Sequence, residues 1–559
     1  MGAQGAIVRS LQKGTDARTG ALLGVLVLGK DAADVPYDLR DGFIQVGLAH
    51  ALAASGFQVS LILASVLTLG RALPTSRQIM LGASALLLYG FLTGVEPSIV
   101  RAILMGFAGL AALGLQRQTR PVGVLLAIAT LMLLYKPLWI WDLGFQLSVL
   151  ATLGLLITVP PLVKALDCLP PVLATAIAVP LAATIWTLPL QLYTFGVLPL
   201  YSLFANVLTA LLLSILTIGG FIASCLALLW PDLGSLIAWF LLWPTQLLMG
   251  IVMGISQLPG HALAIGSISL LQLLGLYGCI GAVWLLPRWQ KQWRFVAVLG
   301  FLILVIPLWH IQTQRFLVTV FDRTHIPMMV IEHPNSTVVL NSGDALNASQ
   351  SLVPFLQQEG INRVDWAIAT HPDDLSKSGW TALLKKISIT HLSRCIPQAF
   401  PAGIKGQPQR QLDVNPQEKL ALGPLQMILW RVQPTILELQ IGPQRWWMVD
   451  GSNESDFLAW LSTVPLPSIQ VLWWMGDPLS PSMVERLHPQ VLILSGRKVT
   501  PSAIAALEAV VPKVLWTERD GTIQWTPDRV LVLRSILETI LFRFYDGDFL
   551  QSLLYALSA

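Results

Sequence analysis

The chain has 559 residues, of which 54% are hydrophobic and only 12% are charged, and its formal net charge is +4. Soluble proteins carry about 25% charged residues, so this composition excludes an ordinary soluble protein and indicates one that crosses a membrane several times. The four cysteines include no Cys-x-x-Cys pair, which excludes a disulfide framework and a thiolate zinc site.

The charged residues are unevenly distributed along the chain. Residues 43–310 contain ten Lys or Arg and four Asp or Glu, whereas residues 311–559 contain twenty and twenty-two. The first balance is typical of a membrane domain and the second of a soluble domain. We therefore divide the chain into a lead-in over 1–42, a transmembrane domain over 43–310 and a globular domain over 314–559.

Apolar runs in the transmembrane domain are long enough to cross a bilayer, which takes roughly 20 residues. About ten are predicted, near 43–69, 78–95, 98–115, 121–139, 143–160, 170–195, 200–230, 235–257, 265–287 and 295–310. With this number, the basic loops that include Arg71, Arg117, Lys164 and Arg288 share one side, and basic loops face the cytoplasm. The globular domain is therefore predicted to lie outside the cytoplasm.

Several polar residues interrupt the predicted spans: His50, Ser55, Gly56 and Gln58 in "GLAHALAASGFQ", Arg101, Asp142, Gln146, Gln191 and Asn206. Polar groups in a bilayer are costly and usually face a cavity or a partner, so these residues predict a polar path across the membrane. Hydrogen bonds that only hold the helices together are the alternative. For the charged Arg101 and Asp142 a functional role is favoured. The Ser55-Gly56 pair predicts a close helix approach or a break in the helix.

The sequence of the globular domain predicts strands that alternate with helices. "FLVTVFD", "MMVIEH", "STVVLN", "VDWAIAT", "QRWWMVD", "IQVLWWM" and "PQVLILS" are rich in apolar and β-branched residues, as strands are. "SQSLVPFLQQEG" and "GWTALLKK" predict helices between them. This order indicates α/β layers. Twenty basic against twenty-two acidic residues leave the domain with a net charge of −2, which provides no basic surface for a nucleic acid.

The membrane segments "GLAHALAASGFQ", "GVEPSIVRAILM", "DLGFQLSVLATLGLL" and "LFANVL" resemble, in order and spacing, the competence domain of the ComEC family. The resemblance implies a bacterial inner-membrane channel that imports single-stranded DNA during natural transformation. It also implies that His50, Ser55, Gly56, Arg101, Asp142 to Ser148 and Asn206 are motif residues. Gln58 departs from the family, which usually has His there. The lead-in is expected to be the remnant of a longer family N-terminus.

The globular domain is similar to the metallo-β-lactamase-like domain that closes many ComEC chains. That fold holds metals with a His-rich loop, and here only His371 matches, with Asp373 where a second His is expected. Asn341 replaces an Asp, and Asp450 alone matches a bridging carboxylate. The resemblance therefore implies a degenerate metal site at Asn341, His371, Asp373 and Asp450, with no metal, no cofactor and no catalysis.

Three functional hypotheses follow. The first is a DNA-uptake channel in the plasma membrane, with single-stranded DNA as the transported substrate and a DNA receptor and a cytoplasmic helicase as partners. The second is a non-conducting membrane scaffold that only binds partners. The third is a membrane-anchored nuclease outside the cytoplasm, which would need a metal at His371 and Asp450. Association into a homo-oligomer is compatible with each of them.

Overall fold

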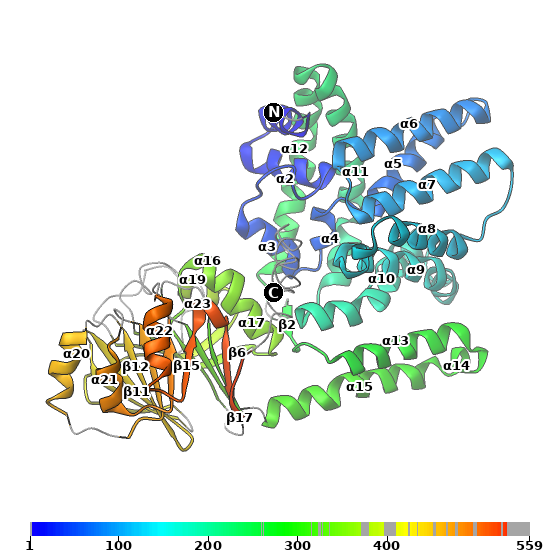
Figure 1. Cartoon of the computed structure of the whole chain (residues 1–559). Coiled ribbons are helices and arrows are strands. Elements are labelled where there is room, and N and C mark those ends of the chain that lie inside the picture. The colour runs from blue at the N-terminus through cyan, green and yellow to red at the C-terminus, as the bar shows by residue number, and fades with distance from the viewer. Residues whose placement is uncertain are drawn as a thin grey trace. The chain divides into compact units, whose positions relative to one another are not determined.

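The structure is a computed structural model of the whole chain. It describes residues 3–533 except 259, 261, 315, 322–325, 327, 335, 371–378, 396–409, 423–424, 433, 451–453, 465–467, 476–478, 496–499 and 527–528. The chain forms two compact units (Figure 1). The first comprises Met1–Leu263 and Ser269–Gly300, and the second comprises Ala264–Ile268 and Phe301–Ala559.

The first unit is helical. Its helices are α1 (Ala3–Gly14), α2 (Ala17–Leu28), α3 (Tyr37–Gln45), α4 (Ala49–Leu52), α5 (Gly56–Leu69), α6 (Thr75–Thr93), α7 (Pro97–Leu115), α8 (Pro121–Tyr135), α9 (Leu143–Ala165), α10 (Pro171–Phe195), α11 (Ser202–Leu229), α12 (Pro231–Ser256), α13 (Leu270–Leu285) and α14 (Pro287–Lys291). A short 3-10 helix, η1 (Pro137–Trp141), precedes α9, and α15 (Trp293–Gln314) leads into the second unit. Strands β1 (Val197–Pro199) and β2 (Ala262–Ala264) pair with each other.

Five helices in the described part of the chain are long and apolar enough to cross a membrane: α7, α9, α10, α11 and α12. Shorter apolar helices are α2, α5, α8, α13 and residues 293–309 of α15. The predicted membrane bundle is therefore confirmed, whereas the predicted number of ten spans is not. One predicted span, 43–69, is divided among α3, α4 and α5, because the backbone has a positive φ of 78° at Gly47 and is extended at Ala53 and Ser55.

The N-terminal helices belong to the first unit although the sequence predicts a lead-in there. Helix α1 packs against α2 and α12, and the hydroxyl of Ser10 donates to the carbonyl of Pro231 at 2.6 Å. Helix α2 is buried over its whole length after Arg18, which matches its almost entirely apolar sequence. These helices therefore contribute core packing to the bundle.

The second unit contains two mixed β-sheets. One has the strand order β15-β14-β13-β12-β11-β10-β9 and the other β17-β16-β3-β4-β5-β6-β7-β8. The strands are β3 (Leu317–Val320), β4 (Met329–His333), β5 (Ser336–Leu340), β6 (Arg363–Ala369), β7 (Ser388–Arg394), β8 (Arg410–Asp413), β9 (Lys419–Leu422), β10 (Leu425–Arg431), β11 (Thr435–Ile441), β12 (Gln444–Asp450), β13 (Val471–Met475), β14 (Val491–Leu494), β15 (Lys513–Trp516), β16 (Ile523–Thr526) and β17 (Arg529–Leu533). Every strand predicted from the sequence is present.

The two sheets pack face to face with helices outside them, which confirms the predicted α/β layers. The core between the sheets includes Met329 of one sheet and Met427 and Trp473 of the other. Helices α16 (Ala345–Asn347), η2 (Ala348–Leu352, a π-helix), α17 (Val353–Gln358) and α19 (Gly379–Leu384) lie beside the larger sheet, and α20 (Glu454–Leu461), α21 (Pro481–Leu487) and α22 (Pro501–Glu508) beside the smaller. Alternating side chains therefore face an inner and an outer core.

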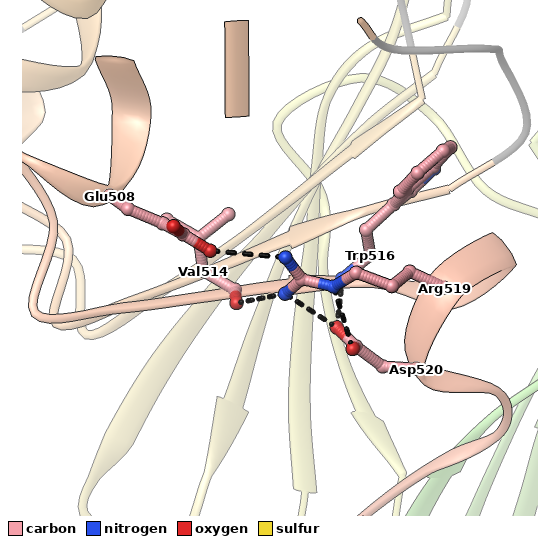
Figure 2. A network of polar contacts seen from close by, with 5 residues as sticks. All are labelled: Glu508, Val514, Trp516, Arg519 and Asp520. Atoms are coloured by element: carbon pink, nitrogen blue, oxygen red, sulfur yellow. Dashed lines mark hydrogen bonds and ion pairs between the residues drawn. The ribbon is translucent and has the colours of Figure 1, made fainter. Parts of the chain in front are cut away.

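A polar network holds one end of the smaller sheet, where the short helix α23 (Thr517–Asp520) follows β15 (Figure 2). The guanidinium of Arg519 donates to both carboxylate oxygens of Asp520 at 2.8 and 3.1 Å and to Glu508 at 3.1 Å. Asp520 also accepts the backbone N–H of Trp516 at 2.8 Å. Hydrogen bonds and charge from the two carboxylates raise the pKa of Arg519, with Asp520 as the larger contributor.

Candidate functional site

The candidate site begins at the break between α4 and α5, in the middle of a predicted span. Ser55 has an extended backbone and Gly56 is the first residue of α5. The N–H of Ser55 donates to Oε1 of Gln58 at 2.6 Å, so the side chain of Gln58 caps the first turn of α5. The N–H groups of the first turn have no partner within the helix and give this end a partial positive charge.

Gln58 connects the start of α5 to the end of α2. Its amide nitrogen donates to the carbonyl of Leu26, and its oxygen also accepts the hydroxyl of Tyr89 at 3.2 Å. The same hydroxyl lies 3.2 Å from the carbonyl of Val27. The last carbonyls of α2 are thereby satisfied by side chains, as buried helix ends require. These contacts hold Gln58 between α2, α5 and α6, and its predicted place in a polar path stays a prediction.

Arg101 faces the start of α5 from the neighbouring helix α7. Its side chain is buried, with 5% of the residue exposed, and Nε donates to Oγ of Ser148 on α9 at 2.8 Å. Nη1 lies 3.4 Å from the sulfur of Met105. A Cβ built on Gly56 would be only 2.5 Å from Nη2, so the guanidinium reaches this position because residue 56 is glycine.

The charge of Arg101 is not matched by an acid. Within the part of the chain that the structure describes, no carboxylate forms an ion pair with it, and its side chain contacts a neutral hydroxyl and a thioether. The positive end of α5 lies against the same guanidinium, which adds to the positive potential rather than neutralising it. A buried cation is costly without a counter-charge, so this position favours an anion.

Other predicted site residues make contacts with residues close to them in the chain. Asp142 accepts the N–H of Phe145 at 2.7 Å as the N-cap of α9, and Gln146 donates to the carbonyl of Ile140 at 2.7 Å. Gln191 donates to the hydroxyl of Thr187 at 3.0 Å, and Asn206 to the carbonyl of Ser202 at 2.8 Å. His50 lies exposed on α4. The structure thus brings together Ser55, Gly56, Gln58 and Arg101, and it satisfies Gln146, Gln191 and Asn206 locally.

Three residues of this region were not selected from the sequence as site residues. Ser148 belongs to the quoted "DLGFQLS" motif, and its hydroxyl accepts the hydrogen bond from Arg101. Its position in the second turn of α9 does not by itself predict this partner. Tyr89 carries a hydroxyl in an otherwise apolar run, and Ser98 donates to the carbonyl of Ala54 at 3.1 Å beside the helix break. A polar atom within a long apolar run is the only signal that marks them.

In the globular unit the predicted degenerate metal site lies at the carboxyl ends of the strands. Asn341 follows β5, is completely buried and has a left-handed backbone with φ 57°. Its amide nitrogen donates to the hydroxyl of Thr370 at 2.8 Å, and its oxygen accepts the N–H of Thr370 at 2.8 Å. Thr435 of β11 lies opposite Asp450 of β12, and its hydroxyl lies 2.9 Å from the carbonyl of Val432 and 3.2 Å from that of Thr370. This network joins the two sheets.

The described residues at this position do not fit a metal centre. Both ends of the Asn341 amide are engaged by Thr370, which follows β6. In the described part of the chain no three His, Cys, Asp or Glu side chains come close enough to share an ion. His371 and Asp373 lie outside the described residues. The expectation that the domain has no catalytic activity stays a prediction.

Taken together, the apolar helices, the interrupted helix and the layered domain define a polytopic membrane protein with a globular α/β domain at its C-terminal side. A family model matches most of the first unit. Residues 26–290 match the family model described as "Competence protein", so this stretch is a competence-protein domain, and the resemblance inferred from the sequence motifs is confirmed.

Two curated relatives match parts of the chain. ComE operon protein 3 of Bacillus subtilis (strain 168) is 25% identical over 397 residues, which are 65% of this chain and 49% of that protein. An uncharacterized protein of Aquifex aeolicus (strain VF5) is 30% identical over 147 residues, which are 26% of this chain and 35% of that protein. The chain therefore spans about half the length of the first relative and about a third of the second.

Solved structures similar to part of the chain include one described as having the metallo-β-lactamase fold. YhfI from Bacillus subtilis, described as a metallo-β-lactamase fold protein, is 12% identical with a TM-score of 0.30, and the match covers 38% of this chain and 100% of that one. Zn²⁺-bound PqqB from Methylobacterium extorquens is 9% identical with a TM-score of 0.27, and the match covers 38% of this chain and 99% of that one. At this level the likeness concerns the fold alone.

Proposed function

We propose that the protein is an inner-membrane channel that imports single-stranded DNA in natural transformation. One observation carries the proposal: the buried guanidinium of Arg101 lies against the N-terminus of the interrupted helix α5, with no acidic partner among the described residues. The competence-protein domain over 26–290 supports the same process.

The chemistry of this position suits a phosphate. Arg donates in a planar fork that matches phosphate oxygens, and the N–H groups at the start of a helix are a common phosphate site. Half-helix N-termini at membrane depth face anionic substrates in many transporters. A strand of DNA carries one negative charge per nucleotide, so each phosphate in turn would meet the same site.

A conducting path must hold its substrate weakly enough to release it. Among the predicted path residues, Arg101 is the only full positive charge, while Ser55, Gln58, Gln146, Gln191 and Asn206 are neutral. One cation per passing phosphate provides attraction without a row of tight sites. The role proposed for Arg101 is therefore to draw phosphate into a low-dielectric region, and the neutral groups border the passage.

The test is to replace Arg101 by Ala and by Lys and to measure the transformation frequency with a marker DNA. We expect Arg101→Ala to abolish transformation with the protein level in the membrane unchanged. Arg101→Lys keeps the charge without the planar fork and is expected to be partly active. Arg117→Ala, on the exposed loop after α7, is the matched control. Transformation by Arg101→Ala at the wild-type frequency would refute the proposal.

A second candidate, a non-conducting scaffold, is favoured by the local contacts of Gln58, Gln191 and Asn206. Each of them is satisfied by a backbone or hydroxyl group, as in a bundle that only holds together. A scaffold predicts that deletion of the gene reduces uptake only through partner proteins, and that Arg101→Ala leaves uptake intact. A DNA receptor and a cytoplasmic helicase remain the proposed partners of the channel.

The proposed location is a bacterial plasma membrane, with the globular domain outside the cytoplasm. Arg288, Lys291 and Arg294 gather around α14, between α13 and α15, and basic loops face the cytoplasm. If α13 and α15 each cross the membrane, the second unit follows on the opposite side. The third hypothesis, a nuclease, is tested by metal analysis of the purified full chain, since bound zinc or manganese at one ion per protein would support it.

A further inference from the structure

Five residues of the loop between α12 and α13 belong to the globular unit. This segment, Ala264–Ile268, is assigned to the second unit although the helices on both sides of it belong to the first. It lies on the turn between α17 and β6, at residues 358–362. We call the segment and this turn the clasp.

Asn362 binds both polar groups of one backbone residue in the clasp. Its Oδ1 accepts the N–H of Ala264 at 2.8 Å, and its Nδ2 donates to the carbonyl of Ala264 at 2.6 Å. The amide of Asn362 thus makes the two hydrogen bonds to Ala264 that the backbone of a neighbouring strand would make. A third hydrogen bond runs from the N–H of Ser267 to the carbonyl of Gln358 at 2.7 Å. The segment is therefore held at both ends.

Packing complements these hydrogen bonds. Ala264, at the end of the short strand β2, and Ile268, in the loop after it, are buried, with 5% and 3% of their surfaces exposed. Gly266 has φ +98°, and a Cβ built on it would lie 3.5–3.6 Å from backbone atoms of Gln358 and Gly360. Glycine is favoured here because the conformation is left-handed, whereas the space itself would admit a methyl group at ordinary contact distance. Such order in a loop needs compensating contacts, since fixing each residue costs conformational entropy.

We infer that residues 264–268 are a structural element of the globular domain. The chain therefore enters the domain between α12 and α13, leaves it again before α13, and returns to it through α15. Within the domain, Asn362 and Gln358 hold this segment in place.

The clasp also fixes the membrane side of the loop. A segment that is part of the domain must lie on the same side of the membrane as the domain. The loop over 257–269 contains no Lys or Arg, whereas the region around α14 contains three within seven residues, 288–294. This charge difference agrees with a domain outside the cytoplasm.

The experiment is amide hydrogen exchange on the full chain in lipid nanodiscs, read by mass spectrometry over residues 262–269 and 356–363. Asn362→Ala removes two of the hydrogen bonds from the domain side. Gly266→Ala perturbs the clasp from the loop side, because alanine disfavours the left-handed conformation. Asn415→Ala is the control, since Asn415 is also an exposed asparagine of this domain and binds only Glu418.

Both clasp variants are expected to accelerate exchange at Ala264 and Ser267 by roughly tenfold or more, as the loss of one or two hydrogen bonds implies. Exchange over β12 is expected to stay unchanged, which shows that the domain remains folded. The control is expected to behave as wild type. The inference is overturned if the amides of Ala264 and Ser267 already exchange at open-loop rates in the wild type, or if neither variant changes them.

Discussion

Gly56→Ala tests the candidate site without touching its charge. The new methyl group would lie 2.5 Å from Nη2 of Arg101, whereas ordinary contacts begin near 3.4 Å. The guanidinium must therefore retreat by about 1 Å, because it is the flexible partner of the two. This movement strains the 2.8 Å hydrogen bond between Nε and the hydroxyl of Ser148, and the new methyl group itself lies at the start of α5.

The size of the effect follows from what is lost. A hydrogen bond to a charged group contributes about 1.5–3 kcal/mol, which corresponds to a factor of roughly 10 to 150. We expect the transformation frequency of Gly56→Ala to fall by about 10- to 100-fold. The double variant with Arg101→Ala should be no worse than Arg101→Ala alone, because both changes act on one interaction.

The assay is transformation with a selectable marker DNA, normalised to the amount of protein in the membrane. Gly109→Ala on α7 is the matched control, because a Cβ at that glycine meets no atom within 4 Å. The control is expected to transform like the wild type. Wild-type transformation by Gly56→Ala at an equal protein level would show that the contact between residue 56 and Arg101 has no part in uptake.

The remaining predictions concern the globular domain of the full chain. Asn341→Ala should destabilise it by about 2–4 kcal/mol, because a buried Thr370 N–H loses its acceptor; the midpoint of denaturant unfolding measures this. Burial raises the pKa of Cys395 from 9.0 to about 12, so the unfolded thiol ionises first and stability falls with rising pH between these values, by up to about 1.4 kcal/mol per pH unit. Cys395→Ala should remove that slope from thermal unfolding curves. Asp520→Ala should lower the unfolding temperature more than Glu508→Ala, because Asp520 also accepts a backbone N–H, and an equal effect would contradict this.

Local patterns were enough to predict some of the elements of this protein. Apolar runs such as "VLWWM" gave buried strands, and the Ser55-Gly56 pair predicted the interrupted helix, because both follow from the residues themselves. The number of spans was less accessible, since helix length depends on where the backbone breaks. The burial of α2 was missed, because a 12-residue apolar helix is too short to signal a span.

The partners within the candidate site were not predictable from spacing. Arg101 could be selected because a charge in a span is unusual. Ser148 is 47 residues away in the chain and lies beside it only because α7 packs against α9. Asn341 and Thr370 are 29 residues apart and meet because β5 and β6 are parallel neighbours. Such pairs depend on tertiary contacts, which a periodic pattern does not contain.

The contact between the end of α2 and the start of α5 determines which mutations this membrane unit tolerates. Helices of 12 and 14 residues are about 18 and 21 Å long, so neither crosses the roughly 30 Å hydrocarbon layer alone. The C-terminal end of α2 carries a partial negative charge and the N-terminal end of α5 a partial positive charge. Both charges arise from backbone groups, so replacing side chains leaves them in place. Loss of a single residue from α2 would instead swing its terminal carbonyls by about 100° and away from Gln58 and Tyr89. Length, more than composition, is what this part of the gene must preserve.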